Sequence, residues 1–298
     1  MNFDIGGAVD TAVNYVLDNF SPALDLIAAV IGFVTGGIQS GLVAIPMPLG
    51  IAILVLLSLW RVGVGFAVFT GVALYLVTHM GLWGAMMETL SLVIASTLMA
   101  MVIGLPLGIA MARRDTVATI VRPILDLMQT MPAFVYLIPA AMFFGLGAVP
   151  GAIATVIFSM PPVVRLTNLG IRQVHAEFIE AGNAFGCTRA QLLFKVQLPN
   201  AMPSIMAGIN QTIMLSLSMV VIASMIGAGG IGNTVLTGIQ RLDVGTGFEG
   251  GLAVVVLAVI LDRLTQSLGS GRASVLQSLL RRRSTAVSAP PVSAVPAT

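Results

Sequence analysis

Seven apolar stretches follow one another along this chain, and most are long enough to cross the hydrocarbon core of a membrane. A helix rises 1.5 Å per residue, so about 20 residues cross roughly 30 Å of hydrocarbon. The stretches are 48–59, 62–78, 86–111, 128–146, 151–164, 203–226 and 250–268. The first and fifth are short, so they begin earlier, tilt, or lie behind neighbouring helices. The pattern predicts an all-α polytopic membrane helix bundle with about seven transmembrane helices.

Composition excludes a water-soluble globule. Charged residues make up 9% of the chain and hydrophobic residues 57%, whereas an ordinary soluble domain carries about a quarter charged residues. A net charge of +2 is too small to argue for nucleic acid as a partner. Cys187 is the only cysteine, which excludes an intrachain disulfide and a Cys-based zinc site. We therefore expect no metal and no nucleic acid.

The first 47 residues differ from the rest because they contain acidic but no basic residues. A secretory signal peptide needs a basic start, so we expect this segment to be retained. Helical spacing relates Val9, Val13, Val16, Leu17 and Phe20, with Asp10, Asn14 and Asp18 on the opposite face. This is typical of an amphipathic helix at an interface. Residues 26–45 are apolar but rich in glycine. We interpret them as an interfacial or re-entrant segment, with a membrane span as the alternative. We assign residues 1–47 to an N-terminal extracytoplasmic or interfacial helical segment.

The basic residues predict the orientation of the bundle. If the seven stretches are threaded in order, all basic residues except Arg241 fall on one side. They are Arg61, Arg113, Arg114, Arg122, Arg165, Arg172, Arg189, Lys195, Arg263, Arg272, Arg281, Arg282 and Arg283. The positive-inside rule then places the N-terminus outside and the C-terminus in the cytoplasm. Residues 48–268 form the transmembrane domain, and residues 269–298 form a cytoplasmic tail, largely disordered because it ends in Ser, Ala, Val and Pro without an apolar period.

No single depth of the membrane holds the pair of acidic and basic side chains that an intramembrane enzyme needs. His79 and His175, the only histidines, lie on opposite sides, and Glu88 and Asp126 lie near opposite span ends. A general acid and base cannot be assembled from them, so we expect no catalysis. The middles of the spans hold no ionisable residue, whereas ion-driven transporters usually carry one there. Transport energy would therefore arrive from outside the membrane. A stand-alone secondary transporter or channel for small osmolytes, or a scaffold without transport, remain the alternatives.

The longest loop between spans, about residues 165–202, concentrates charge in an otherwise uncharged chain. It contains Glu-Ala-Gly-Asn-Ala-Phe-Gly at 180–186 and, nine residues later, Val-Gln-Leu-Pro at 196–199. The pattern predicts two short helices joined at Gly186, where glycine allows positive φ, with Pro199 ending the second. Small side chains at Ala181, Gly182 and Ala184 would allow a partner to approach closely.

This pattern resembles the EAA loop of ABC importer permeases, with Gly182 in place of the second Ala and Val196 in place of Ile. The resemblance implies a type I ABC importer permease-like fold and a coupling helix that docks into a cytoplasmic ATPase subunit. The implied docking residues are Glu180, Ala181, Gly182, Ala184, Phe185, Gly186, Leu198 and Pro199. It also implies that this chain binds no cofactor, because ATP and Mg belong to the partner ATPase.

Further segments within about residues 48–268 are similar to the permeases of importers for glycine betaine, proline betaine and choline. They include 125–139, 144–147, 161–167, 218–227 and 261–263. The similarity implies a permease subunit of an ATP-driven, binding-protein-dependent importer in the bacterial inner membrane. Its implied partners are the ATPase, an extracytoplasmic substrate-binding protein, a second permease copy and membrane lipid.

Candidates for the translocation path come from the fourth and sixth stretches. Methionine suits a path that adapts to a bulky cation, and aromatic rings attract quaternary ammonium groups, although both are also ordinary packing residues. Pro132 and Pro139 should bend the fourth stretch, which favours a position lining a cavity. The candidates are Met128, Gln129, Thr130, Met131, Pro132, Phe134, Tyr136, Ser218 and Met219.

Two groups of glycines receive different interpretations. The pairs Gly104/Gly108 and Gly147/Gly151 have the small-xxx-small spacing of helix contacts. The glycine-rich segment 227–232 lacks the ending of a phosphate loop. We expect it to be a flexible or re-entrant outer segment that, with Arg241, Asp243 and Glu249, receives the binding protein.

Overall fold

The computed structural model describes residues 5–269, and every regular element in them is a helix. The all-α prediction is therefore confirmed, while the predicted disordered tail lies outside the described residues except for Gly269. The elements are α1 (Ile5–Val43), α2 (Met47–Arg61), α3 (Val64–His79), α4 (Trp83–Arg113), α5 (Asp115–Thr130), α6 (Ala133–Phe144), α7 (Ala148–Arg172), α8 (Ala176–Ala184), α9 (Arg189–Gln191), the π-helix η1 (Leu192–Gln197), α10 (Leu198–Ala223), the 3₁₀-helix η2 (Ser224–Ile226), α11 (Ile231–Arg241) and α12 (Val244–Gly269).

Five helical segments are long and apolar enough to cross a membrane, and a sixth results if the bent pair α5 and α6 counts as one span. The five are Val13–Val43, Trp83–Arg113, Ala148–Arg172, Arg189–Ile226 and Val244–Ser267. The prediction of about seven differs because it counted 48–59 and 62–78. These stretches are α2 and α3, which have 15 and 16 residues and turn back on each other at Gly63. At 1.5 Å per residue each is shorter than the hydrocarbon core is thick.

Helices α4, α7 and α10 form the centre of the bundle and pack through small residues. A Cβ added at Gly104 would lie 2.6 Å from Val163 Cγ1, and one at Gly108 would lie 2.7 Å from the Val164 carbonyl oxygen. A Cβ added at Gly208 of α10 would lie 3.1 Å from Val163 Cα of α7. The Ser216 hydroxyl donates to Ser159 Oγ at 2.9 Å between the two buried helices. The predicted role of Gly104 and Gly108 in helix contact is confirmed.

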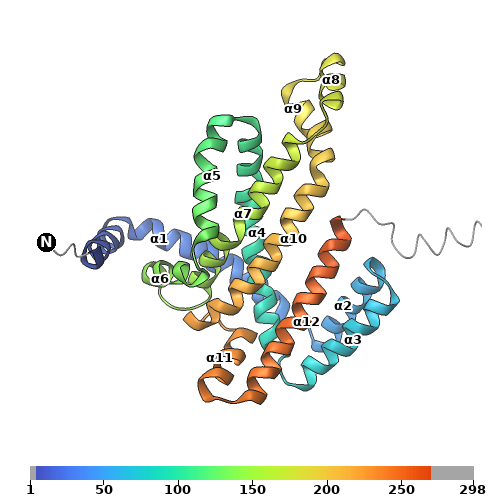
Figure 1. Cartoon of the computed structure of the whole chain (residues 1–298). Helices are drawn as coiled ribbons and strands as arrows, with labels where there is room; N and C mark the ends of the chain where they lie inside the picture. Colours follow the sequence, from blue (N-terminus) through green and yellow to red (C-terminus); the bar gives the residue numbers. More distant parts are fainter. Residues whose placement is uncertain (1–4, 270–298) are drawn as a thin grey trace, which may run out of the picture.

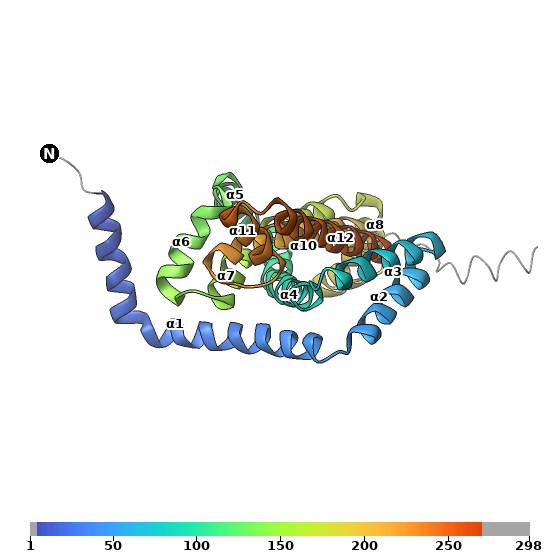
Figure 2. The ribbon, with the colours of Figure 1, turned by 90° about the horizontal axis from the view of Figure 1, so that it is seen from below.

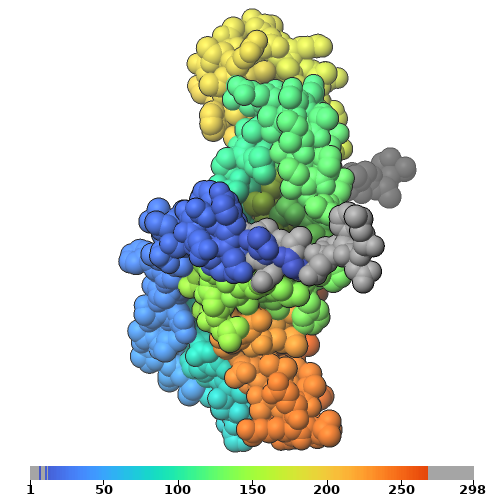
Figure 3. Space-filling model, turned by 90° about the vertical axis from the view of Figure 1, so that its left-hand side faces the viewer, coloured from blue at the N-terminus to red at the C-terminus, as the bar shows by residue number. Residues whose placement is uncertain are grey.

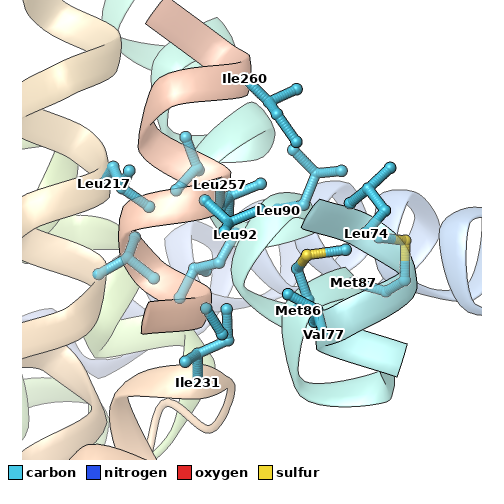
Figure 4. Close-up of a cluster of buried hydrophobic side chains, with 14 of the residues drawn as sticks. Leu74, Val77, Met86, Met87, Leu90, Leu92, Leu217, Ile231, Leu257 and Ile260 are labelled. Carbon is cyan, nitrogen blue, oxygen red and sulfur yellow. The ribbon is translucent and has the colours of Figure 1, made fainter. Parts of the chain in front are cut away.

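One hydrophobic cluster joins six helices near the end of the bundle that carries α11. It brings together side chains of α3, α4, α7, α10, α11 and α12 (Figure 4). The labelled members are Leu74, Val77, Met86, Met87, Leu90, Leu92, Leu217, Ile231, Leu257 and Ile260. Because lipid is as apolar as these side chains, close packing rather than water exclusion stabilises this end.

Helix α1 runs across the back of the bundle rather than along it (Figures 1 and 2). It contains Pro22 and bends once, as a proline inside a helix requires. It runs crosswise to the long helices of the bundle (Figure 2), whereas its length and composition alone would allow residues 13–43 to span a membrane. Large apolar side chains such as Phe33 and Leu26 point away from the bundle.

The predicted fourth span is broken into α5 and α6, whose axes differ by 100°. Pro132 precedes α6 and has no N–H to continue α5, so Met131 takes an extended conformation between the two. Two ion pairs fasten α5 to α7: Arg165 to Asp126 at 2.5 Å and Arg172 to Asp115 at 2.7 Å. The chain therefore turns sharply where a cavity-lining helix was predicted.

Candidate coupling and translocation site

Helix α8 stands at one extreme of the molecule, beyond the end of α5 (Figures 1 and 3). It ends at Ala184, and the φ of +72° at Gly186, two residues later, confirms the predicted left-handed bend. The Cys187 N–H donates to the Gly182 carbonyl at 3.0 Å and closes the turn. A Cβ at Gly186 would meet no atom within 4 Å. Glycine is therefore needed here for its backbone conformation and not for space.

The predicted docking residues divide between two faces of α8. Glu180, Ala181 and Ala184 are exposed, and Phe185 is 89% exposed. Gly182 is buried, because a Cβ there would lie 2.7 Å from Leu192 Cδ1 of η1. A large exposed aromatic surrounded by small side chains is suited to insertion into a partner. Gly182 instead holds α8 against η1 and does not face outward.

The prediction that Pro199 ends a helix is wrong. Pro199 lies in the first turn of α10, and the chain is helical from Arg189 to Ile226. A proline inside an α-helix clashes with the carbonyl four residues earlier. Here a π-helix precedes it, and the Leu198 N–H bonds to the Leu193 carbonyl, five residues back. The wider turn accommodates the ring, so the predicted loop 165–202 shortens to the connection around α8.

A capping box that the sequence analysis did not identify starts this long helix. The Gln191 N–H donates to Thr188 Oγ1 at 3.3 Å, and the Thr188 N–H donates to Gln191 Oε1 at 2.8 Å. The Thr-x-x-Gln spacing is a known helix-start signal. It fixes the direction in which the chain leaves Gly186.

The predicted path residues are also separated by the fold. Gln129, Thr130, Pro132, Phe134 and Ser218 are exposed in this single chain, and Met128 and Met131 are partly buried. Tyr136 and Met219 lie in a buried cluster between α6, α7 and α10. The Tyr136 hydroxyl donates to the Met128 carbonyl at 2.5 Å, so its polar end is already bonded. Both side chains are therefore buried between helices of this chain.

Two polar side chains lie on one exposed stripe of α10. Gln211 and Ser218 are exposed at seven-residue spacing, and Met225, seven residues further along in η2, is also exposed. Asn210 on the same helix donates to Asp262 of α12 at 3.2 Å. The sequence analysis identified Ser218 but not Gln211. The seven-residue spacing, which places both on one helix face, could have identified Gln211.

The opposite end of the bundle is held by α4. The Gly230 N–H donates to Glu88 Oε2 at 2.9 Å, and the Ile231 N–H donates to Thr89 Oγ1 at 2.9 Å. Both donors belong to the start of α11, where a negative charge is favourable. These two bonds tie the glycine-rich segment 227–232, which was predicted to be flexible or re-entrant, to α4.

Exposed side chains gather at the turn between α11 and α12. Leu242 is 88% exposed with a positive φ of 54°, and Val244 and Phe248 are also exposed. Asp243 caps α12: Thr246 Oγ1 donates to its carboxylate at 2.7 Å and the Thr246 N–H at 3.2 Å. These bonds, the side-chain bond foremost, lower the pKa of the Asp243 carboxyl below 3.8. The turn is a shaped surface that presents apolar groups beside Arg241 and Glu249.

Residues 5–269 contain no group of three or more His, Cys, Asp or Glu side chains that could hold a metal ion. The carboxylates of Asp115, Asp126 and Asp262 are engaged by ion pairs or an amide hydrogen bond.

Comparison with known proteins agrees with this arrangement. Residues 104–272 match the family described as binding-protein-dependent transport system inner membrane component. The chain is 51% identical over 262 residues to the glycine betaine/proline betaine transport system permease protein ProW of Escherichia coli, covering 88% of this chain and 74% of that protein. It is 49% identical to the glycine betaine transport system permease protein OpuAB of Bacillus subtilis, covering 87% of this chain and 92% of that one.

A solved structure shares the fold. The inward-facing MetNI methionine ABC transporter gives a TM-score of 0.55 at 24% identity, covering 67% of this chain and 95% of the other. At this identity the likeness concerns architecture alone. With a family match over more than half its length and relatives near 50% identity, the chain belongs to the ABC importer permeases, the inner membrane components of binding-protein-dependent transport systems.

Proposed function

We propose that this chain imports a quaternary ammonium osmolyte, such as glycine betaine, proline betaine or choline, as the permease subunit of an ATP-driven importer. The names of its relatives support the substrate class. The observation that carries the coupling role is α8, a separate helix that presents Phe185 beyond the bundle. ATP and Mg²⁺ belong to a separate ATPase, and this chain hydrolyses nothing.

The coupling step follows from the two faces of α8. Its outward residues, Glu180, Ala181, Ala184 and Phe185, seat in a cleft of the cytoplasmic ATPase. Gly182, in contact with Leu192, joins α8 to the helix that continues into α10. When ATP closes the ATPase pair, the two α8 helices of a permease dimer are drawn together, which turns the path from inward-open to outward-open.

The distribution of basic residues supports the orientation. Arg113, Arg114, Arg189 and Lys195 belong to the end of α4 and the segment after α8, and Arg241 belongs to the opposite end at α11. The positive-inside rule then places α8 in the cytoplasm of the bacterium, the C-terminus on the same side and the N-terminus outside.

The exposed face formed by α5, α6 and α10 is the proposed wall of the path. Gln129, Thr130, Phe134 and Ser218 face outward from this single chain, and a second permease copy would enclose them. Short polar groups and one aromatic ring bind a permanent cation weakly. Weak contacts suit a path, because high affinity would retain the osmolyte inside it.

The turn between α11 and α12 is the proposed dock of the extracytoplasmic binding protein. Leu242, Val244 and Phe248 are exposed beside Arg241 and Glu249. An apolar centre rimmed by charge is typical of protein interfaces. The start of α11, next to this turn, is bonded to Glu88, so the proposed binding surface keeps one shape.

Reconstitution in liposomes tests the function. The chain, its ATPase and its binding protein together should accumulate labelled glycine betaine only when ATP is present. Ala181→Glu, at an exposed site on α8, should abolish uptake and co-purification of the ATPase while the protein still inserts. The matched control is Ala190→Glu, an exposed site on α9. Gradient-driven uptake by the chain alone would instead favour a secondary transporter.

A further inference from the structure

A groove of about 820 Å³ opens between the end of α4, the start of α5 and the helix that begins at α9. Its lining combines three arginines, Arg113, Arg114 and Arg189, with apolar residues that include Pro106, Ile109 and Leu192. All three arginine side chains are exposed. The groove is therefore cationic at its rim and apolar in its wall.

The three arginines differ from the two on α7. Arg165 and Arg172 are paired with Asp126 and Asp115. Within residues 5–269, none of the three side chains of Arg113, Arg114 and Arg189 forms an ion pair or a hydrogen bond. Three unpaired guanidinium groups around one groove repel one another unless an anion lies between them. Guanidinium binds phosphate oxygens in a two-pronged geometry that suits this role.

The apolar part of the groove continues down one face of α4. Leu98 and Val102 are exposed, the latter by 73%, and Pro106, Ile109 and Arg113 follow at spacings of three or four residues. Residues at this spacing share a helix face. From Leu98 to Arg113 the helix rises about 22 Å, roughly the thickness of one bilayer leaflet with its headgroups.

We propose that this groove binds an anionic phospholipid, with its phosphate between the three arginines and an acyl chain along Leu98 and Val102. Basic pockets between membrane helices on the cytoplasmic side are suited to such headgroups. An acidic protein surface would neutralise the arginines but would leave the apolar face of α4 without a role. Free phosphate would also leave it uncovered. The proposal does not depend on which solute the chain carries.

Native mass spectrometry of the full-length chain in detergent tests the site. The probes are phosphatidylglycerol and phosphatidylcholine with the same acyl chains. The variant R113Q/R114Q/R189Q is compared with K195Q, which removes a charge from η1 at an exposed residue outside the groove. A basic residue near an anionic surface strengthens binding about 5-fold. The triple variant should therefore bind phosphatidylglycerol on the order of 100-fold more weakly, and K195Q should resemble the wild type.

Three further measurements decide between occupants. Soluble glycerophosphoglycerol and inorganic phosphate should fail to displace the bound lipid at millimolar concentration, and displacement by either would overturn the lipid assignment. Equal retention of phosphatidylglycerol by the wild type and the triple variant would also overturn it. The lipid assignment would also be overturned if the triple variant no longer co-purified with the ATPase but still retained the lipid. If the triple variant does not fold, R114Q alone, at an exposed residue, should still weaken lipid binding about 5-fold.

Discussion

The two ends of this bundle both depend on glycine, but for different physical reasons. At the α8 end, Gly186 has empty space around it and a positive φ. At the α11 end, a Cβ at Gly238 would lie 2.4 Å from the Gly247 nitrogen, and one at Gly230 would lie 2.3 Å from Thr89 Oγ1. Gly186 is needed for backbone shape alone and Gly238 for close approach, while Gly230, with a φ of +77°, meets both demands at once. The α11 end is in addition bonded to Glu88 and Thr89 of α4.

Gly238→Val should have the largest effect, because the obstructing atoms belong to the backbone of Gly247 and cannot move aside. We expect a loss of about 3 kcal/mol or more in the free energy of unfolding, at the upper end for overpacked sites. Fluorescence-detected size exclusion after heating measures it. Gly251→Val is the matched control, since a Cβ at Gly251 on the same hairpin meets no atom within 4 Å. Equal stability of the two variants would remove the close-approach explanation.

Gly186→Pro should leave the bundle folded and abolish ATP-dependent uptake. Proline fixes φ near −65°, which is incompatible with the +72° observed. The orientation of α8 would change while its distant helices stay in place. Gly186→Asn is the control, because asparagine tolerates the left-handed region, and it should keep most of the uptake. Normal uptake by the proline variant would show that α8 needs no fixed orientation.

Glu88→Ala should destabilise the α11 end moderately. The Gly230 N–H would lose its acceptor in a partly buried site, which costs about 2 kcal/mol. Glu88→Gln keeps an acceptor oxygen and should lose about 1 kcal/mol less. Thermal unfolding of both variants gives the comparison, and an unchanged melting temperature for Glu88→Ala would contradict the capping role.

Thr246→Val should have the smallest effect, and one that depends on pH. The folded pKa of Asp243 is lowered, first by the Thr246 hydroxyl. The carboxylate therefore adds stability above its unfolded pKa near 3.8, and this contribution is lost as pH falls through the lower folded value. Without the hydroxyl, the pKa of Asp243 should rise. The melting temperatures of wild type and variant should differ at pH 7, and the difference should shrink as the pH falls below 3.8. A difference that does not change with pH would point to packing instead.

Features that depend on neighbouring residues in the chain could be predicted from the sequence. The positive φ at Gly186 and the break at Pro132 are confirmed because each follows from local sterics. The helix contacts of Gly104 and Gly108 are confirmed because their four-residue spacing leaves one face of α4 open to a neighbouring helix. The Thr188 capping box was equally local and could have been found. The motif around α8 identified the family because its spacing is specific.

Features that depend on tertiary packing could not be predicted. Membrane helices are apolar all round, so periodicity does not tell which face is buried, and Tyr136 and Met219 were placed on the path although they lie in the core. The bond from Gly230 to Glu88 joins residues 142 positions apart. Pro199 was expected to end a helix because a π turn, which depends on the whole segment, has no sequence signature of its own.

The π turn before Pro199 has a mechanical consequence. It joins α9 to α10, so that 38 residues from Arg189 to Ile226 form one continuous helical segment, roughly 55 Å long at about 1.5 Å per residue. The segment begins next to α8 and ends next to α11, whose start is bonded to α4. Under the proposed coupling role, a force on α8 would therefore reach the opposite end of the bundle along one unbroken backbone, without passing through a loop.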